Sequence, residues 1–97
     1  MKIKTSELTG AALDWAVAMA ENWAGADFEV RPYSTNWAQG GPIIEREKIG
    51  LLPSGNAYYE RNGGTYYSYG PTPLIAAMRC YCASKLGDTV EIPEELR

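Results

Sequence analysis

The chain has 97 residues, with nine Lys and Arg against twelve Asp and Glu, and a net charge of −3. A hydrophobic content of 45% argues against a disordered chain and fits one domain with one modest core. The acidic balance disfavours non-specific binding to nucleic acid, which needs a cationic footprint. It favours a basic protein partner or a small ligand.

The start of the chain and its few cysteines set further limits. Met1 to Ser6 lacks the apolar run of a signal peptide, and no stretch approaches the roughly 20 apolar residues of a membrane helix, so we expect a cytoplasmic protein. Cys80 and Cys82 would point about 200° apart on a helix, which prevents a bridge between them, and we expect structural thiols. With no His in the chain, we expect no metal site and no cofactor.

Residues 9–24 have the pattern of an amphipathic helix. Thr9 is a suitable N-cap residue and Gly25 a suitable stop. The spacing predicts one buried face, formed by Leu13, Ala16, Val17, Ala20 and Trp23. Asp14 and Glu21 share the polar face, where we expect them to be solvated.

The segment after this helix has weaker signals. Phe28-Glu29-Val30 alternates apolar and polar residues, which predicts a short half-buried strand ending at Pro32. A loop from Tyr33 to Gly41 follows, because aromatic, amide and glycine residues are mixed there without periodicity. Pro42 suits the first turn of a short helix, and residues 43–48 are compatible with either a helix or an extended segment.

The second half predicts an antiparallel meander. Its strands are expected at residues 49–52, 57–61 and 65–69, and its turns at residues 53–56 and 62–64. The order of strands and turns predicts two successive hairpins.

A second helix is expected at residues 72–86. Thr72-Pro73 is a strong helix start, and Gly87 suits the stop. Its shared apolar face consists of Leu74, Ile75, Met78, Cys82 and Leu86. Val90 and Ile92 predict a short edge strand, and residues 93–97 a mobile tail.

These elements predict the fold class. We expect one α+β domain over residues 1–97, in which a small antiparallel sheet of three to four strands packs with two main helices, at about 9–24 and 72–86.

The carboxylates give little indication of catalysis. Without His, acid-base chemistry falls to carboxylates, Lys, Tyr or Cys. Glu45 and Glu47 flank Arg46 and share a face only if the segment is extended. This alternation is more typical of a solvated surface, and we expect a protein that is not an enzyme.

Trp37 has two interpretations. Between Asn36 and Gln39, it suits a contact residue that fills a partner's pocket or stacks on a planar ligand. Alternatively, it folds back onto the core, which is the more common fate of Trp.

Gly40, Gly41 and Arg79 suggest a weaker, ligand-binding interpretation. Two glycines before Pro42 resemble a turn whose free amides hold an anion, although an ordinary structural turn is favoured because no P-loop or dinucleotide motif is present. Arg79 either binds an anion or pairs with a glutamate of the central segment, and the pair is favoured.

Three blocks of the sequence are specific enough to compare with known families. They are residues 2–10 with 13–17, residues 33–35 with 37–44, and residues 70–79. In this order they resemble the phage NinX family, a family of unknown function found in tailed phages and prophages. The resemblance covers Met1 to about Pro93, with a variable-looking part between Leu51 and Tyr69. It implies a phage or prophage accessory protein in a bacterial cytoplasm, and it implies no catalytic residues.

The leading functional hypothesis is a non-enzymatic binder and modulator of a host or phage protein, with a bacterial defence component as one candidate target. The predicted contact residues are Tyr33, Trp37, Gln39, Glu45 and Glu47. The alternative is a binder of a nucleotide-like anion, which Gly40, Gly41 and Arg79 would hold while Trp37 stacks on the base. Nucleic acid and membrane partners are not expected.

Overall fold

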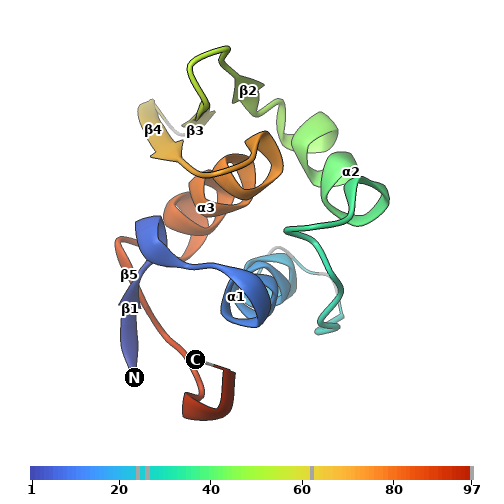
Figure 1. The fold of residues 1–97 in the computed structure, drawn as a ribbon, viewed down its shortest axis with the longest axis vertical. Coiled ribbons are helices and arrows are strands. Elements are labelled where there is room, and N and C mark those ends of the chain that lie inside the picture. Colours follow the sequence, from blue (N-terminus) through green and yellow to red (C-terminus); the bar gives the residue numbers. More distant parts are fainter. Residues whose placement is uncertain (24, 26, 62, 97) are drawn as a thin grey trace.

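The computed structural model describes residues 1–23, 25, 27–61 and 63–96. In chain order these form β1 (Lys2–Lys4), a 3-10 turn η1 (Thr5–Glu7), α1 (Gly10–Trp23), α2 (Trp37–Glu47), β2 (Gly50–Leu51), β3 (Asn56–Arg61), β4 (Gly64–Tyr69), α3 (Pro73–Leu86), β5 (Thr89–Glu91) and a 3-10 turn η2 (Glu94–Leu96). Strands β2, β3 and β4 form one antiparallel sheet, and β1 and β5 form another. The predicted α+β class is confirmed, with one more helix than expected and the strands divided over two sheets (Figure 1).

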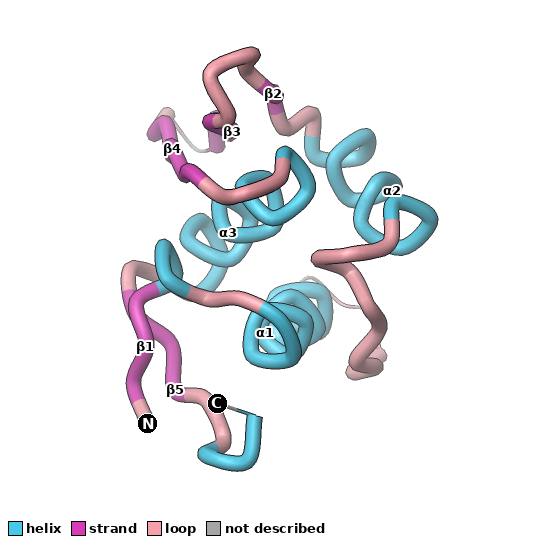
Figure 2. The backbone as a smooth tube through the Cα atoms, in the orientation of Figure 1, coloured by secondary structure: helices cyan, strands magenta, loops and turns pink. Residues whose placement is uncertain are grey.

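Helix α3 lies at the centre of the fold, in contact with α1, α2 and the three-stranded sheet (Figures 1 and 2). It begins as predicted, because Thr72 Oγ1 accepts a hydrogen bond from the Ile75 amide at 3.1 Å and Pro73 opens the first turn. Gly87 ends it with φ at +92°. Its buried residues surround the helix, as suits a central position: Leu74, Ala76, Ala77, Met78, Cys80, Tyr81 and Cys82.

Both cysteines are buried and unbridged, as predicted. The Cys80 thiol lies 3.1 Å from the carbonyl oxygen of Tyr66 on β4. Burial raises the pKa of Cys80 to about 11 and also raises the pKa of Cys82. Both thiols are therefore protonated and unreactive at neutral pH.

The predicted meander is present. Tyr59 pairs with Tyr66 on the face toward α3, while Tyr58 pairs with Tyr67 on the opposite face. Because side chains alternate along a strand, Tyr67 and Tyr69 both lie on this open face and are largely exposed. Asn62 of the predicted second turn lies outside the described residues.

The two ends of the chain meet in the smaller sheet. Ile3 of β1 pairs with Val90 of β5, so the predicted edge strand is confirmed, and its partner is an N-terminal strand that was not predicted. The Met1 ammonium group lies 3.0 Å from Glu91 Oε1. Residues 94–96 of the predicted tail form a 3-10 turn whose Leu96 packs against the core, and Arg97 lies outside the described residues.

Two predictions near the end of α1 are wrong. Phe28-Glu29-Val30 forms no strand, because three alternating residues are too short a pattern and the Phe28 ring instead packs edge-on against Trp15, with ring centres 6.2 Å apart. Trp23 occupies the last position of α1 and is 73% exposed, so the buried face ends at Ala20. The predicted end of the helix at Ala24 lies outside the described residues.

The predicted loop from Tyr33 to Gly41 is also corrected, because it is helical from Trp37 onward. Asn36 caps this helix, with its Oδ1 accepting a hydrogen bond from the Ala38 amide at 2.8 Å. Helix α2 continues to Glu47 and ends at Lys48, whose φ is +59°. The open question about residues 43–48 is thereby settled in favour of a helix.

Candidate functional site

Helix α2 carries a ridge that separates two surface hollows. Ala38, Pro42 and Arg46 stand four residues apart, in one row along the helix, and line both hollows. On one side, a polar groove of about 410 Å³ lies between α2 and residues 27–33. On the other side, an open outer groove of about 790 Å³ follows the surface of α2 itself.

Gly40 fixes the position of α2. It is buried, and a Cβ atom there would lie 2.7 Å from Leu74 Cδ1 on α3 and closer still to the Tyr33 carbonyl oxygen. Only a residue without a side chain permits this approach. Ile43 is buried on the same side, so the inner face of α2 is held against the core.

Pro42 lies in the interior of α2 rather than in its first turn, which corrects the sequence-based placement. Proline has no amide hydrogen to donate to the carbonyl of Ala38, four residues earlier. The helix therefore lacks one backbone hydrogen bond at the ridge between the two grooves.

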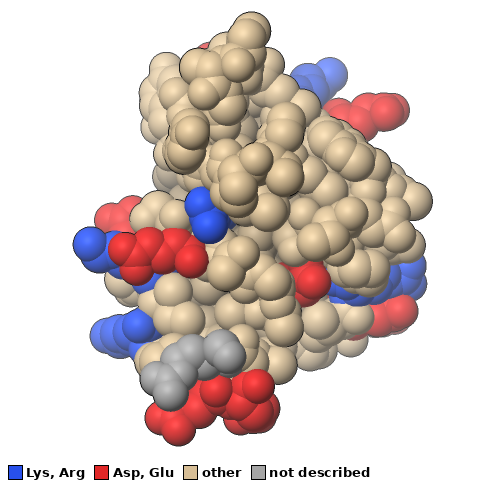
Figure 3. Space-filling view, viewed as in Figure 1, with Lys and Arg blue, Asp and Glu red and all other residues tan. Residues whose placement is uncertain are grey.

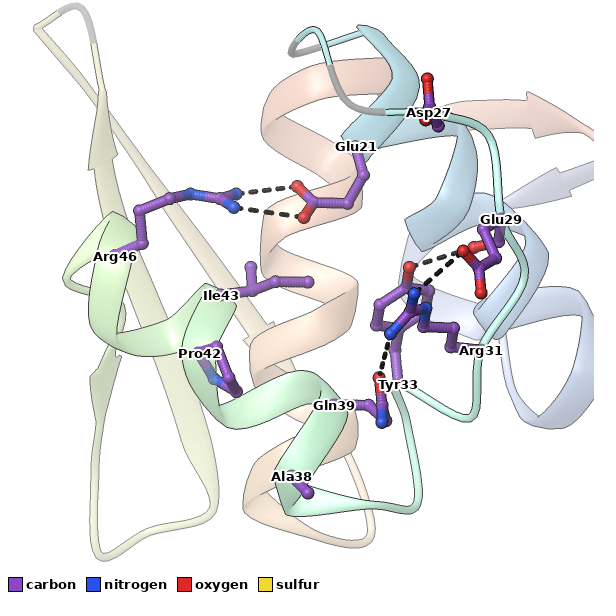
Figure 4. A pocket seen from close by; sticks show the side chains of 10 residues that line it. All are labelled: Glu21, Asp27, Glu29, Arg31, Tyr33, Ala38, Gln39, Pro42, Ile43 and Arg46. Atoms are coloured by element: carbon purple, nitrogen blue, oxygen red, sulfur yellow. Dashed lines mark hydrogen bonds and ion pairs between the residues drawn. The ribbon is translucent and has the colours of Figure 1, made fainter.

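The charges of the polar groove are largely neutralised within it (Figure 4). Arg31 lies 2.9 Å from Glu29 Oε2 and donates to Gln39 Oε1 at 3.4 Å. The Tyr33 hydroxyl donates to the Glu29 carbonyl oxygen at 3.0 Å. The groove is lined by Glu21, Asp27, Glu29, Arg31, Tyr33, Ala38, Gln39, Pro42, Ile43 and Arg46.

Arg46 joins α2 to α1 and α3 through a polar network. Its guanidinium group donates to both oxygens of Glu21, at 2.7 and 3.2 Å (Figure 4). The Tyr81 hydroxyl donates to Glu21 Oε2 at 2.6 Å. Arg46 Nε also donates to Glu47 Oε2 at 2.7 Å, and the other oxygen of Glu47 accepts from the Tyr59 hydroxyl. We call these five residues the Arg46 network.

The Arg46 network determines the charge of its own members. Burial opposes ionisation of Glu21, but hydrogen bonds from Arg46 and Tyr81 outweigh it, and its pKa lies below the ordinary value. The pKa of Glu47 is lowered in the same way, against burial, by Tyr59 and Arg46. Burial and the bond to Glu47 raise the pKa of Tyr59 to about 12. Both carboxylates are thus ionised at neutral pH, which does not suit a general acid.

The outer groove holds the most exposed part of α2. Trp37 is 52% exposed, which decides against the interpretation of this residue as core. It shares the groove with Gly41 and Glu45, which follow at successive turns of the helix, and with Ile44. Glu45 forms no ion pair with any residue that the structure describes.

The predicted contact residues divide between these places. Trp37 and Glu45 come together in the outer groove. Tyr33 and Gln39 line the polar groove, where Tyr33 is buried. Glu47 lies in the Arg46 network and is bonded to Tyr59, so it does not share a face with Glu45.

The residues of the predicted anion site are engaged elsewhere. The Gly40 amide is not free, because it donates to the Asn36 carbonyl at 2.9 Å inside α2, and the expected structural turn at Gly40-Gly41-Pro42 is itself helix. Arg79 binds two backbone carbonyls, those of Leu8 at 2.7 Å and Tyr69 at 2.8 Å. The favoured pairing of Arg79 with a glutamate is therefore wrong, because the arginine ties the α1 entry and the end of β4 to α3.

The sequence did not reveal the role of the α1 carboxylates. Asp14 accepts the Ser34 amide at 2.8 Å, and Glu21 binds Arg46 and Tyr81, so the expectation that both are solvated is wrong. Their partners lie at least 20 positions away in the chain, beyond any local pattern. For α2, the available signal was the Asn36 to Gln39 spacing, which resembles a capping box.

On the face in Figure 3, most charged side chains lie around the rim, where basic and acidic groups are mixed on both sides and a group of acidic side chains lies at the lower edge. Within residues 1–23, 25, 27–61 and 63–96, no group of three or more Cys, Asp or Glu is placed to hold a metal ion. No helix in the same part of the chain has the length and apolar character needed to cross a membrane.

Comparison with known protein families gives a match over most of the chain. The family described as Bacteriophage P22, NinX, matches residues 4–85, which include all of α1, α2 and α3 up to Lys85. The chain therefore belongs to this phage family. No curated protein matches it.

Proposed function

We propose that this NinX-family protein is a non-enzymatic accessory protein of a phage or prophage that binds and modulates a host or phage protein in the bacterial cytoplasm. The outer face of α2 is its contact surface. The observation that carries this proposal is Trp37, whose indole is half exposed on a helix that is otherwise fixed to the core. A bacterial defence component is one candidate target.

Trp37 has the properties of an interface anchor. Tryptophan residues in binding surfaces often supply a large share of the affinity, because they bury much apolar area at a low entropic cost. The inner face of α2 is held by Gly40 and Ile43, and Arg46 is held by Glu21 and Glu47. A surface held in place before binding loses less entropy when the partner docks.

The carboxylates support a binding role over catalysis. Glu21 and Glu47 are already bonded to Arg46 and to two tyrosine hydroxyls, and the pKa of each carboxyl group is lowered. A catalytic acid at neutral pH needs the opposite shift.

The alternative, a binder of a nucleotide-like anion, has less support. The polar groove has a suitable volume, but Arg31 and Arg46 are already paired with carboxylates. A nucleotide panel tests it by thermal shift, because a ligand at 100 times its Kd stabilises the fold by about 2.7 kcal/mol. A clear upward shift in melting temperature with one nucleotide would favour this alternative.

The test of the main proposal compares two exposed tryptophans. Tagged parent protein, Trp37→Ala and Trp23→Ala are used to capture partners from lysate of phage-infected cells. Trp23 is the matched control, since it is 73% exposed and lies on α1 rather than α2. We expect a partner that the parent and Trp23→Ala retain and that a folded Trp37→Ala loses.

The opposite pattern would reject the surface. Retention of every partner by Trp37→Ala contradicts the assignment to α2. Loss on substitution of Tyr67 and Tyr69 alone would place the contact on the open face of the sheet instead.

A further inference from the structure

The outer groove contains a gap in a row of side chains. Trp37, Gly41 and Glu45 occupy successive turns of α2, and the middle residue has no side chain. A Cβ atom on Gly41 would meet only Trp37 Cε3, at an ordinary contact distance of 3.6 Å. Packing therefore does not require glycine at this position, and its absence of a side chain leaves backbone open between an indole and a carboxylate.

The carboxylate at one end of this gap is unpaired. Glu45 forms no ion pair with the described residues. Arg46 is paired with Glu21 and Glu47, and its side chain points toward Glu21 (Figure 4). Glu45 also lies in the last turn of α2, where the helix dipole adds to its negative potential. Arg46 also lines this groove, but its guanidinium group is already paired, so Glu45 is the carboxylate of the groove that is open to a cationic partner.

The indole of Trp37 also favours a cationic partner group. The face of a tryptophan ring attracts cations, and arginine is the cation found there most often. A planar guanidinium group can lie on the ring while its edge donates two hydrogen bonds to a carboxylate, which an ammonium group cannot do. An exposed indole and an unpaired carboxylate that line one groove therefore suit an arginine side chain.

We propose that the outer groove receives an arginine side chain from a basic segment of a protein partner, stacked on Trp37 and paired with Glu45. This inference rests on the proposed function, because it takes the outer face of α2 as the contact surface. The net charge of −3 favours a basic partner in the same direction.

An NMR titration with N-acetyl-arginine amide tests the site without knowing the partner. The parent protein is titrated with this probe and with N-acetyl-citrulline amide, which has the same shape but no charge. We expect the indole signal of Trp37 and the amide signal of Gly41 to shift with the arginine probe. The response to the citrulline probe should be about two- to fivefold weaker.

Trp23 is the internal control in the same spectra. Trp23 is more exposed than Trp37 but lies outside the outer groove. Equal shifts at Trp23 and Trp37 would mean that arginine binds any exposed tryptophan, and would overturn the proposal. Equal shifts with the two probes would overturn it as well.

Two variants locate the interaction. Glu45→Gln should weaken the arginine response about two- to fivefold, while Glu60→Gln, which alters another exposed carboxylate on β3, should leave it unchanged. Gly41→Gln should fill the gap and abolish the response without loss of folding, because glutamine favours a helix. A full response in either Glu45→Gln or a folded Gly41→Gln contradicts the site.

Failure of this inference is distinguishable from failure of the proposed function. If a captured partner is lost on Trp37→Ala but binds Glu45→Gln and Gly41→Gln as tightly as the parent, the α2 surface stands and the arginine site falls. If Trp37→Ala retains every partner, both the α2 contact surface and the arginine site are rejected.

Discussion

The two sides of α2 differ in how closely they are packed, and two adjacent glycines mark the difference. Gly40 faces inward, where a Cβ atom would collide with the Tyr33 carbonyl and Leu74. Gly41 faces the outer groove, where a Cβ atom would make one ordinary contact. The same residue type thus serves packing at one position and leaves an open surface at the next. Composition alone cannot separate the two roles.

Gly40→Ala should have the largest effect on stability. The new Cβ has no room beside a backbone carbonyl, so α2 must move away from α3, and we expect a loss of about 2–3 kcal/mol in the free energy of unfolding. Urea denaturation measures it. A loss below about 0.5 kcal/mol, which is typical of surface substitutions, would show that α2 is not held by close approach at Gly40.

Glu21→Gln should have the next largest effect. It removes the charge that binds Arg46 and accepts from Tyr81, and we expect a loss of about 2 kcal/mol on the same urea assay. Glu91→Gln is the control, because its ion pair with the Met1 ammonium is exposed and should contribute about 0.5 kcal/mol or less. Similar values for the two variants would mean that the Arg46 network contributes no more than a surface pair.

Acid should produce a graded loss of stability in the parent. Folding lowers the pKa of Glu21 and Glu47, so their contribution is complete above the ordinary value of 4.5 and is lost as the pH falls below it. At the alkaline end, the raised pKa of Tyr59, about 12, predicts a second loss as the pH rises above 10. Urea midpoints measured against pH should show a shallower acid decline in Glu21→Gln than in the parent. An identical decline would assign the acid sensitivity to other groups.

Gly41→Ala should stabilise the protein by up to about 1 kcal/mol, because alanine favours a helix interior and its Cβ has room. Thermal and urea unfolding measure the gain. The contrast with Gly40→Ala is the sharpest test of the two-sided character of α2, and destabilisation by both variants would remove that contrast.

Trp37→Ala should change stability least, by about 0.5 kcal/mol or less, because half of the indole is exposed. Its effect should appear in partner binding instead. A loss of several kcal/mol in unfolding free energy would mean that Trp37 acts mainly in packing.

Local signals predicted the parts of the fold that they control. The hydroxyl cap and proline at Thr72-Pro73 placed the start of α3, and strand-forming residues between turn signals placed β3 and β4. Helix α2 was missed in its first half because Gly40, Gly41 and Pro42 are typical of a turn. The close approach of Gly40 to α3 favours helix there despite the low intrinsic propensity of these residues.

The candidate site was predictable only in part. Trp37 and Glu45 were identified, but their common groove depends on helix α2, whose first half was predicted to be a loop. Glu21 was assigned to solvent because its partners come from α2 and α3, at separations of 25 and 60 residues. Such contacts leave no trace in a local pattern.

The two buried thiols at the centre of α3 can report on opening of the core. A thiol reagent reaches Cys80 only when α3 parts from the sheet, since its sulfur lies against the Tyr66 carbonyl, and Cys82 is fully enclosed. At high reagent concentration the labelling rate equals the rate at which the core opens, and at low concentration it follows the population of the open state. A comparison of labelling rates with and without a bound partner would therefore measure how docking on the outer face of α2 changes the lifetime of the closed core.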